Sequence, residues 1–234
     1  MRLYRVHLNS RCKEARRDLA DPYQMHATLC RAFLPSEAPC PVGTLLWRLE
    51  PETDADGRAR VLIQSRETPD WSRIAVQGWL AREEPGKVLA FGAVQAGQSF
   101  RFRLRANPCK TVQGKRQGLL HPDAQREWLA RKGELHGFTL PPFLPEDYFE
   151  EMPNPGGALQ YDVRISHQKM IIGRQHGGNT IRIYSALFEG RLSVTDPEKF
   201  EAALTSGIGH GKSMGLGLVS IAAPQWRCQA GQHA

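Results

Sequence analysis

Tyr23 and His26 are a pair whose residue types and spacing could do chemistry. Because they are three residues apart, they would share one side of a helix. The free N–H groups at a helix start favour a nearby phosphate, and histidine exchanges protons near neutral pH. The pair therefore indicates proton transfer at a phosphate group. A tyrosine and a histidine that flank an apolar stripe also commonly serve packing and a surface hydrogen bond.

The segment 207–217 combines glycines with a cation and a hydroxyl, Lys212 and Ser213. Glycines expose backbone N–H groups and allow a ligand to approach closely. The segment contains Gly-x-Gly-x-Gly-Lys-Ser, but a phosphate-binding P-loop follows a strand and opens a helix. Here the segment follows a predicted helix and precedes a predicted strand, so nucleotide hydrolysis is not indicated. A tight turn would explain one or two of the glycines but not all five: Gly207, Gly209, Gly211, Gly215 and Gly217.

Two kinds of catalytic site find no support in the sequence. No His-x-His or HExxH spacing indicates a catalytic metal, and no Gly-x-Ser-x-Gly indicates a serine hydrolase. The five cysteines form no CxxC pair, which argues against a zinc ribbon or a disulfide framework. We expect no metal and no cofactor. A nuclease of this composition would use acid–base catalysis, with the 2′-hydroxyl of RNA as nucleophile.

Positive charge is segregated along the chain. The formal net charge is +7, and the segments 101–122 and 163–188 contain Lys and Arg but no carboxylate. Acidic residues gather at 50–56 and 146–151. Such segregation is typical of a face that binds a polyanion, although exposed basic residues also serve solubility. In the first basic segment, three arginines alternate with apolar residues and would share one face of a strand: Arg101, Arg103 and Arg105.

The predicted elements repeat one order, strand–helix–strands–helix–strand. In the first pass the predicted strands lie at 3–8, 45–49, 61–64 and 87–94. The predicted helices begin at 22 and span 71–80, and a basic loop lies at 11–17. In the second pass the predicted strands lie at 99–105, 159–165, 169–172, 180–188 and 218–222. The predicted helices span 122–132 and begin at 197, and a loop lies at 141–157. Asp-Pro at 21–22 and 196–197 is typical of a helix start. This order predicts an α+β protein with two tandem ferredoxin-like (RRM-like) βαββαβ domains, 1–95 and 98–224, and a tail at 225–234.

The sequence also bears on location. Charge interrupts the amino terminus at once, so it has no apolar signal core, and no uncharged apolar stretch reaches the ~18 residues of a membrane span. We expect a cytoplasmic protein without a membrane partner.

Three blocks together carry a family resemblance. They are Tyr-Gln-Met-His at 23–26, Phe-Arg-Leu-Arg-Ala-Asn-Pro at 102–108 with Lys110, and Gly-Ile-Gly-His-Gly-Lys-Ser-Met-Gly-Leu-Gly-Leu at 207–218. In this order they resemble the CasE-type CRISPR endoribonuclease of type I-E systems, in the RAMP superfamily. The resemblance implies an enzyme with two ferredoxin-like domains that binds the hairpin of CRISPR repeat RNA, and not DNA, as its substrate. It implies cleavage without metal at the 3′ base of the stem, giving a 2′,3′-cyclic or 3′ phosphate and a 5′-hydroxyl. The product RNA would stay bound, and the protein would join other subunits of the Cascade antiviral complex.

The resemblance also implies roles for single residues. The family's catalytic pair falls on His26 and Tyr23, and its glycine-rich segment makes Lys212 a candidate to stabilise charge on the phosphate. Further RNA contacts are expected at Arg101, Arg103, Arg105, Lys110, Arg164, Lys169, Arg174, Gly209, Gly211 and Ser213. Of these, Arg164, Lys169 and Arg174 are chosen by charge alone, for a basic hairpin within 163–182. The alternative is a tandem ferredoxin-like scaffold subunit that binds the hairpin without cutting it.

Overall fold

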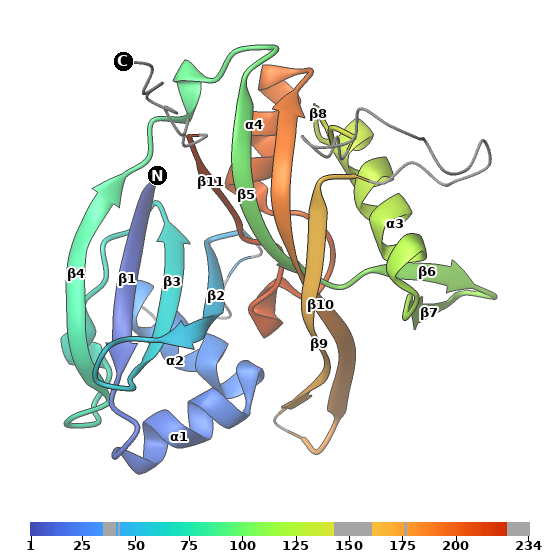
Figure 1. The fold of residues 1–234 in the computed structure, drawn as a ribbon. Helices are drawn as coiled ribbons and strands as arrows, with labels where there is room; N and C mark the ends of the chain where they lie inside the picture. The colour runs from blue at the N-terminus through green and yellow to red at the C-terminus, as the bar shows by residue number, and fades with distance from the viewer. Residues whose placement is uncertain (35–40, 42, 143–160, 176, 224–234) are drawn as a thin grey trace, which may run out of the picture.

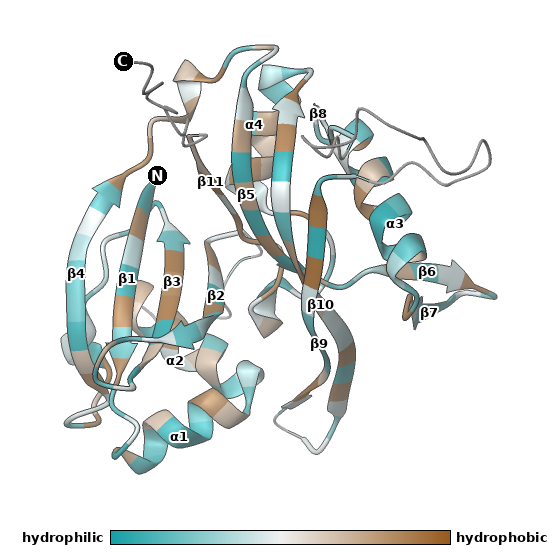
Figure 2. Ribbon diagram, viewed as in Figure 1, coloured by the Kyte–Doolittle hydropathy of each residue, from teal (hydrophilic) through white to brown (hydrophobic). Residues whose placement is uncertain are grey.

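The amino-terminal half of the molecule is built on an antiparallel sheet. The computed structural model describes residues 1–34, 41, 43–142, 161–175 and 177–223. Within these residues the sheet has the order β2-β3-β1-β4, with β1 (Arg2–Leu8), β2 (Leu45–Thr53), β3 (Ala59–Ser65) and β4 (Leu80–Val88). The edge strand β4 is mostly hydrophilic, as Figure 2 shows in teal. Charged side chains and Pro85 on this edge limit pairing with another chain.

Two helices, α1 (Lys13–Ala20) and α2 (Pro22–Phe33), supply side chains to the core of this half. Met25, Leu29 and Phe33 of α2 are buried against Val6 and Ile63 of the sheet. Two short 3-10 turns, η1 (Trp71–Arg73) and η2 (Phe91–Ala93), lie before and after β4.

The carboxyl-terminal half forms a second antiparallel sheet beside the first, as Figure 1 shows. Its order is β11-β5-β10, with β8 and β9 paired to the remaining edge of β10. The strands are β5 (Ser99–Ala106), β8 (Phe138–Thr139), β9 (Val163–Arg174), β10 (Thr180–Val194) and β11 (Val219–Ala222). Two helices supply its core, α3 (Pro122–Leu135) and α4 (Pro197–Ser206), and a separate hairpin is formed by β6 (Cys109–Val112) and β7 (Lys115–Gly118).

Both sheets have the strand connectivity of a split βαβ unit. In the first, β1 lies between β3 and β4; in the second, β5 lies between β10 and β11. The first strand of each half thus lies between the last two strands of its sheet. The predicted tandem ferredoxin-like fold is confirmed.

Buried polar contacts join the two halves. The Arg48 guanidinium, 1% exposed, donates to the Arg103 carbonyl at 2.9 Å and to the Leu218 carbonyl at 3.1 Å. It also donates to Ser220 Oγ at 2.9 Å. Gln64 Nε2 donates to the Leu204 carbonyl at 2.7 Å. Because unpaired buried polar groups are costly, these contacts restrain one sheet against the other.

Several predictions for the amino-terminal half are wrong. The predicted basic loop at 11–17 largely belongs to α1, because Asp18 is buried and accepts from Thr28 Oγ1 and Trp79 Nε1 at 2.7 and 2.8 Å. The predicted helix at 71–80 is only the short turn η1, and the predicted strand at 87–94 is displaced to 80–88. Gly78, with φ +77°, reverses the chain just before β4 pairs with β1.

In the carboxyl-terminal half, the predicted strands at 159–165 and 169–172 are one strand, β9, within the described residues. A bulge at His167, with φ +47°, interrupts its alternation and made it look like two strands. β10 extends beyond 188 to Val194, and the hairpin β6–β7 was not predicted. Most of the predicted loop at 141–157 and the tail at 225–234 lie outside the described residues. No helix in the described ranges is long and apolar enough to cross a membrane.

Candidate active site and nucleic-acid interface

The start of α2 is fixed in place by Asp21. Its side chain accepts from Tyr23 N at 3.0 Å, as expected for an N-cap before a proline. The same carboxylate accepts from Arg174 N at 3.1 Å, and Gln24 Nε2 donates to the Arg174 carbonyl at 3.3 Å. The helix that carries Tyr23 and His26 is therefore attached to the end of β9.

His26 lines a cavity of about 310 Å³ between α2 and the glycine segment. Its other walls include His210, Lys212 and Ser213, together with Gly209 and Gly211. His26 Nε2 lies 3.7 Å from Cys30 Sγ, whereas Nδ1 is buried without a hydrogen-bond partner in the described part of the chain. The structure thus brings together residues nearly 190 positions apart: an imidazole, an ammonium group and a hydroxyl.

Tyr23 lies elsewhere. It packs against the small apolar cluster of Ile171, Met214 and Leu216, and it does not line the His26 cavity. Gly173 leaves room for it, because a Cβ at that position would lie 3.0 Å from the Cβ of Tyr23. The pairing of Tyr23 with His26 that their spacing suggests is therefore not seen in this structure.

The backbone of the glycine segment explains its composition. All five glycines have positive φ, from +75° to +92°. A Cβ on Gly215 would lie 2.8 Å from the Trp47 ring, and Gly217 N donates to the Arg105 carbonyl at 2.8 Å. The argument that a turn explains only one or two glycines is wrong, because this connection, with η3 (Lys212–Met214) inside it, needs all five. As predicted, it runs from a helix to a strand and is not a P-loop.

Cations from three elements act on His210, which lines this cavity. Burial lowers the pKa of His210, and Arg116 of β7, Lys132 of α3 and Lys212 lower it further. Burial also lowers the pKa of His136, as do Lys132 and Lys212. Sequence reasoning missed Arg116, Lys132 and His136, although Arg116 belongs to the carboxylate-free run at 101–122. This arrangement favours a polyanion beside the His26 cavity.

Comparison with known proteins decides the family. The family model described as CRISPR associated protein matches residues 1–223. The chain belongs to this CRISPR-associated family. It is 39% identical to the CRISPR-associated endoribonuclease Cse3 of Thermus thermophilus, over 95% of this chain and 100% of the relative. It is 29% identical to the Cascade subunit CasE of Escherichia coli, over 86% of this chain and 92% of the relative. A structure of Thermus thermophilus Cse3 bound to an RNA representing a pre-cleavage complex matches with a TM-score of 0.76 and 35% identity, over 94% and 98% of the two chains.

The three arginines of β5 have different surroundings in this CRISPR-associated protein. Arg103 forms ion pairs with Glu50, Glu52 and Glu189. Burial alone would lower the pKa of Arg103, but hydrogen bonds to these carboxylates raise it above its ordinary value. These ion pairs give Arg103 a structural role, and its predicted RNA contact stays a prediction. Arg101 is exposed and lines an outer groove, whereas Arg105 is buried against a second cavity.

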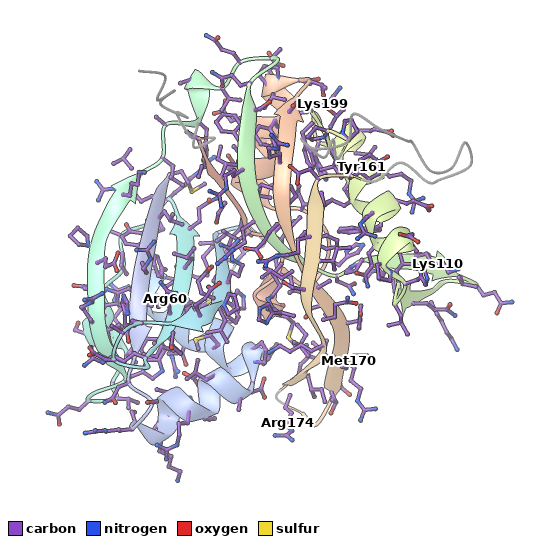
Figure 3. The ribbon with its side chains drawn as sticks, viewed as in Figure 1. Arg60, Lys110, Tyr161, Met170, Arg174 and Lys199 are labelled. Carbon is purple, nitrogen blue, oxygen red and sulfur yellow. The ribbon has the colours of Figure 1, made fainter. Side chains whose placement is uncertain are left out.

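The remaining predicted RNA contacts are also spread over different surfaces. Arg164, exposed on β9, pairs with Glu189 at 2.6 Å. Figure 3 shows Lys110 on the β6–β7 hairpin and Arg174 at the free end of the β9–β10 hairpin. Lys169 lines the second cavity with Arg105. Among the described residues, no group of three His, Cys, Asp or Glu side chains is placed to hold a metal ion.

Proposed function

We propose that this protein is an endoribonuclease that binds the hairpin of CRISPR repeat RNA and cleaves it at the 3′ base of the stem. The RNA-bound and endoribonuclease relatives support the activity. The observation that carries the proposal is that His26 lines one cavity together with Lys212 and Ser213. A scissile phosphate in this cavity would meet a proton-transfer group, a cation and backbone N–H donors together.

The proposed reaction is an attack by the RNA itself. The 2′-oxygen adds in line to the adjacent phosphorus and loses its proton, while the bond to the 5′-oxygen breaks and that oxygen gains a proton. The products are a 2′,3′-cyclic phosphate and a 5′-hydroxyl. His26 moves one of these protons, and Lys212 offsets the extra negative charge of the phosphorane. No metal takes part in this scheme.

Tyr23 enters the proposal as an orienting group. Catalytic hydrogen bonds are often incomplete in a ligand-free site and form in the substrate complex. We expect the Tyr23 hydroxyl to contact the ribose or His26 once RNA is bound. Tyr23→Phe should lower the single-turnover cleavage rate at unchanged hairpin affinity, because the ring keeps its packing against Met214. An unchanged rate would leave Tyr23 with the packing role alone.

The relation to Cascade completes the proposal. The Escherichia coli relative is named a Cascade subunit, and we propose that this protein likewise keeps its product RNA and assembles with other Cascade subunits. Arg116, Lys132 and Lys212 would contact the stem phosphates, since they surround His210 at the edge of the His26 cavity.

The decisive experiment incubates the wild-type protein with a repeat hairpin in EDTA. We expect one cut, with the upstream product ending in a cyclic or 3′ phosphate. Tight binding with intact RNA would instead make the protein a non-cleaving scaffold subunit. Cleavage that stops in EDTA and returns with a divalent cation would exclude the metal-free scheme.

A further inference from the structure

A second cavity, of about 620 Å³, lies between the two halves of the molecule. Trp47 and Glu50 from β2, Asp18 from α1, Arg105 from β5 and Lys169 from β9 are among its walls. It adjoins the glycine segment, because Met214 and Gly215 line this cavity while Gly211, Lys212 and Ser213 line that of His26. The two cavities thus share the segment that carries the proposed phosphate contacts.

Two residues in the walls of this cavity carry hydrogen-bond donors without acceptors within the described residues. Arg105 is 8% exposed, and within the described residues it forms no ion pair with a carboxylate. Its Nη1 reaches only the His167 carbonyl at 3.5 Å and Ser185 Oγ at 3.4 Å, both long for a hydrogen bond. Arg105 Nε and Trp47 Nε1 are buried without a hydrogen-bond partner among the described residues.

The carboxylates in the walls are already engaged. Asp18 accepts from Thr28 and Trp79, and Glu50 forms ion pairs with Arg48 and Arg103. Neither forms an ion pair with Arg105, and the charge of Glu50 offsets its burial only in part.

The two cations in the walls also repel each other. Burial lowers the pKa of Arg105 and the charge of Arg48 lowers it further, while the charge of Glu50 raises it without cancelling the shift. Although Lys169 is exposed as a whole, desolvation of its ammonium group and the charge of Arg105 both lower its pKa. A buried cation without a partner destabilises a fold, and a bound anion would offset that cost.

The size of the cavity limits which ligands can fit. Sites for small ligands measure about 300–1,000 Å³, which suits one or two nucleotides and excludes a duplex. We propose that this cavity binds a phosphate group of the single-stranded RNA that continues from the base of the stem, with Arg105, Lys169 and Trp47 Nε1 as donors. This subsite rests on the proposed function, because its ligand is the RNA that the His26 site cleaves.

The binding test compares three RNAs blocked by a 2′-deoxy nucleotide at the cleavage site. One is the bare hairpin, and the others carry a four-nucleotide single strand on the 5′ or the 3′ side. For the wild type, one extension should raise the affinity and steepen the dependence of log affinity on log salt by about 0.7 per phosphate contact. Arg105→Met and Lys169→Gln should lose this gain, and Trp47→Phe should reduce it roughly 2- to 10-fold, as expected for one hydrogen bond. Arg66→Gln, an exposed arginine outside the cavity, should keep it.

A stability measurement separates ligand binding from a structural role. Without RNA, Arg105→Met should raise the melting temperature, because an apolar side chain replaces a buried cation that has no partner. Arg103→Met should lower it, because three carboxylates each lose one of their partners. An Arg105→Met variant that melts earlier and keeps the gain from the extension would overturn the proposal.

The outcomes of these experiments also distinguish a failure of the subsite proposal from a failure of the proposed function. If the wild type binds no hairpin, the proposed function itself fails. If the wild type cleaves the hairpin but no extension raises its affinity, only the subsite is wrong. Protection of the wild type against heat by adenosine monophosphate, lost in Arg105→Met and without any gain from the extensions, would assign the cavity to a free nucleotide instead of RNA.

Discussion

Replacing His26 with alanine tests the centre of the proposed mechanism. Positioned proton transfer contributes about 10²–10⁴-fold to a rate. At 1.36 kcal/mol per tenfold, His26→Ala should therefore raise the barrier by about 2.7–5.4 kcal/mol. The fold should tolerate the change, because the imidazole borders a cavity, its Nδ1 has no partner in the described residues and its Nε2 makes one long contact with Cys30 Sγ.

The assay is single-turnover cleavage of a labelled repeat hairpin, with affinity measured separately on a 2′-deoxy substrate. We expect the rate to fall by at least two orders of magnitude while affinity stays within a few-fold of wild type. His121→Ala is the matched control, since that imidazole lies outside the cavity with a side chain 76% exposed. A rate within tenfold of wild type would refute proton transfer by His26. A parallel loss of affinity would make His26 a binding or structural residue.

Three other predictions test the chemistry and the fold. A 2′-deoxy substitution at the nucleotide 5′ of the scissile phosphate should stop cleavage at unchanged affinity, whereas continued cleavage to a 3′-hydroxyl would show that water attacks. Arg103→Met should lower the free energy of unfolding by roughly 1–3 kcal/mol in urea titrations, because Glu50 loses one of its partners in a site where it is 8% exposed. Acid should destabilise the amino-terminal half, because the pKa of Glu84 is lowered by its hydrogen bond with His7 and that of Asp54 by the Arg58 N–H. The stabilisation is fully present at a pH above the ordinary pKa values of 4.5 for Glu84 and 3.8 for Asp54, and it is lost as the pH falls through the lower pKa values of the folded state. Glu84→Gln should therefore make the free energy of unfolding fall less steeply as the pH is lowered.

Local sequence predicts the elements whose signals are local. The alternation of Tyr4, Val6 and Leu8 predicts β1, and their side chains are all buried. Asp21-Pro22 predicts the start of α2, where the Asp21 side chain accepts from the Tyr23 N–H. In both cases the deciding contacts lie within a few residues of the pattern, so periodicity and capping suffice.

The predictions that failed depend on distant contacts. β4 is mostly exposed and its sequence has little alternation, so its place follows from pairing with β1. The bulge at His167 depends on how β9 meets β10. The arginine pattern of β5 predicts one shared face, but not that Glu50 and Glu52 of the other half would meet Arg103 there.

The candidate site was predictable only in part for the same reason. A family resemblance points to His26 and Lys212, but the cavity that joins them exists only once α2 and the glycine segment are packed together. Arg116 and Lys132 act on His210 of that cavity from a hairpin and a helix whose positions no local pattern sets. The spacing of Tyr23 and His26 predicts that they share one side of α2. In the structure, however, Tyr23 packs against the cluster that contains Met214, so spacing alone did not predict its surroundings.

The glycine segment is the element through which the two halves make one site. Its Gly215 contacts Trp47 of the first sheet so closely that a Cβ would clash, and its Gly217 N–H binds the Arg105 carbonyl of the second. Just before Gly215, Met214 packs in one cluster with Tyr23. A shift of either sheet would therefore move Lys212 relative to His26, since the segment is anchored to both. Separate halves would each keep a core, but the proposed proton-transfer group and the proposed cation would no longer share a cavity. We infer that the tandem arrangement is itself a requirement of the chemistry, because His26 and Lys212 come from different halves.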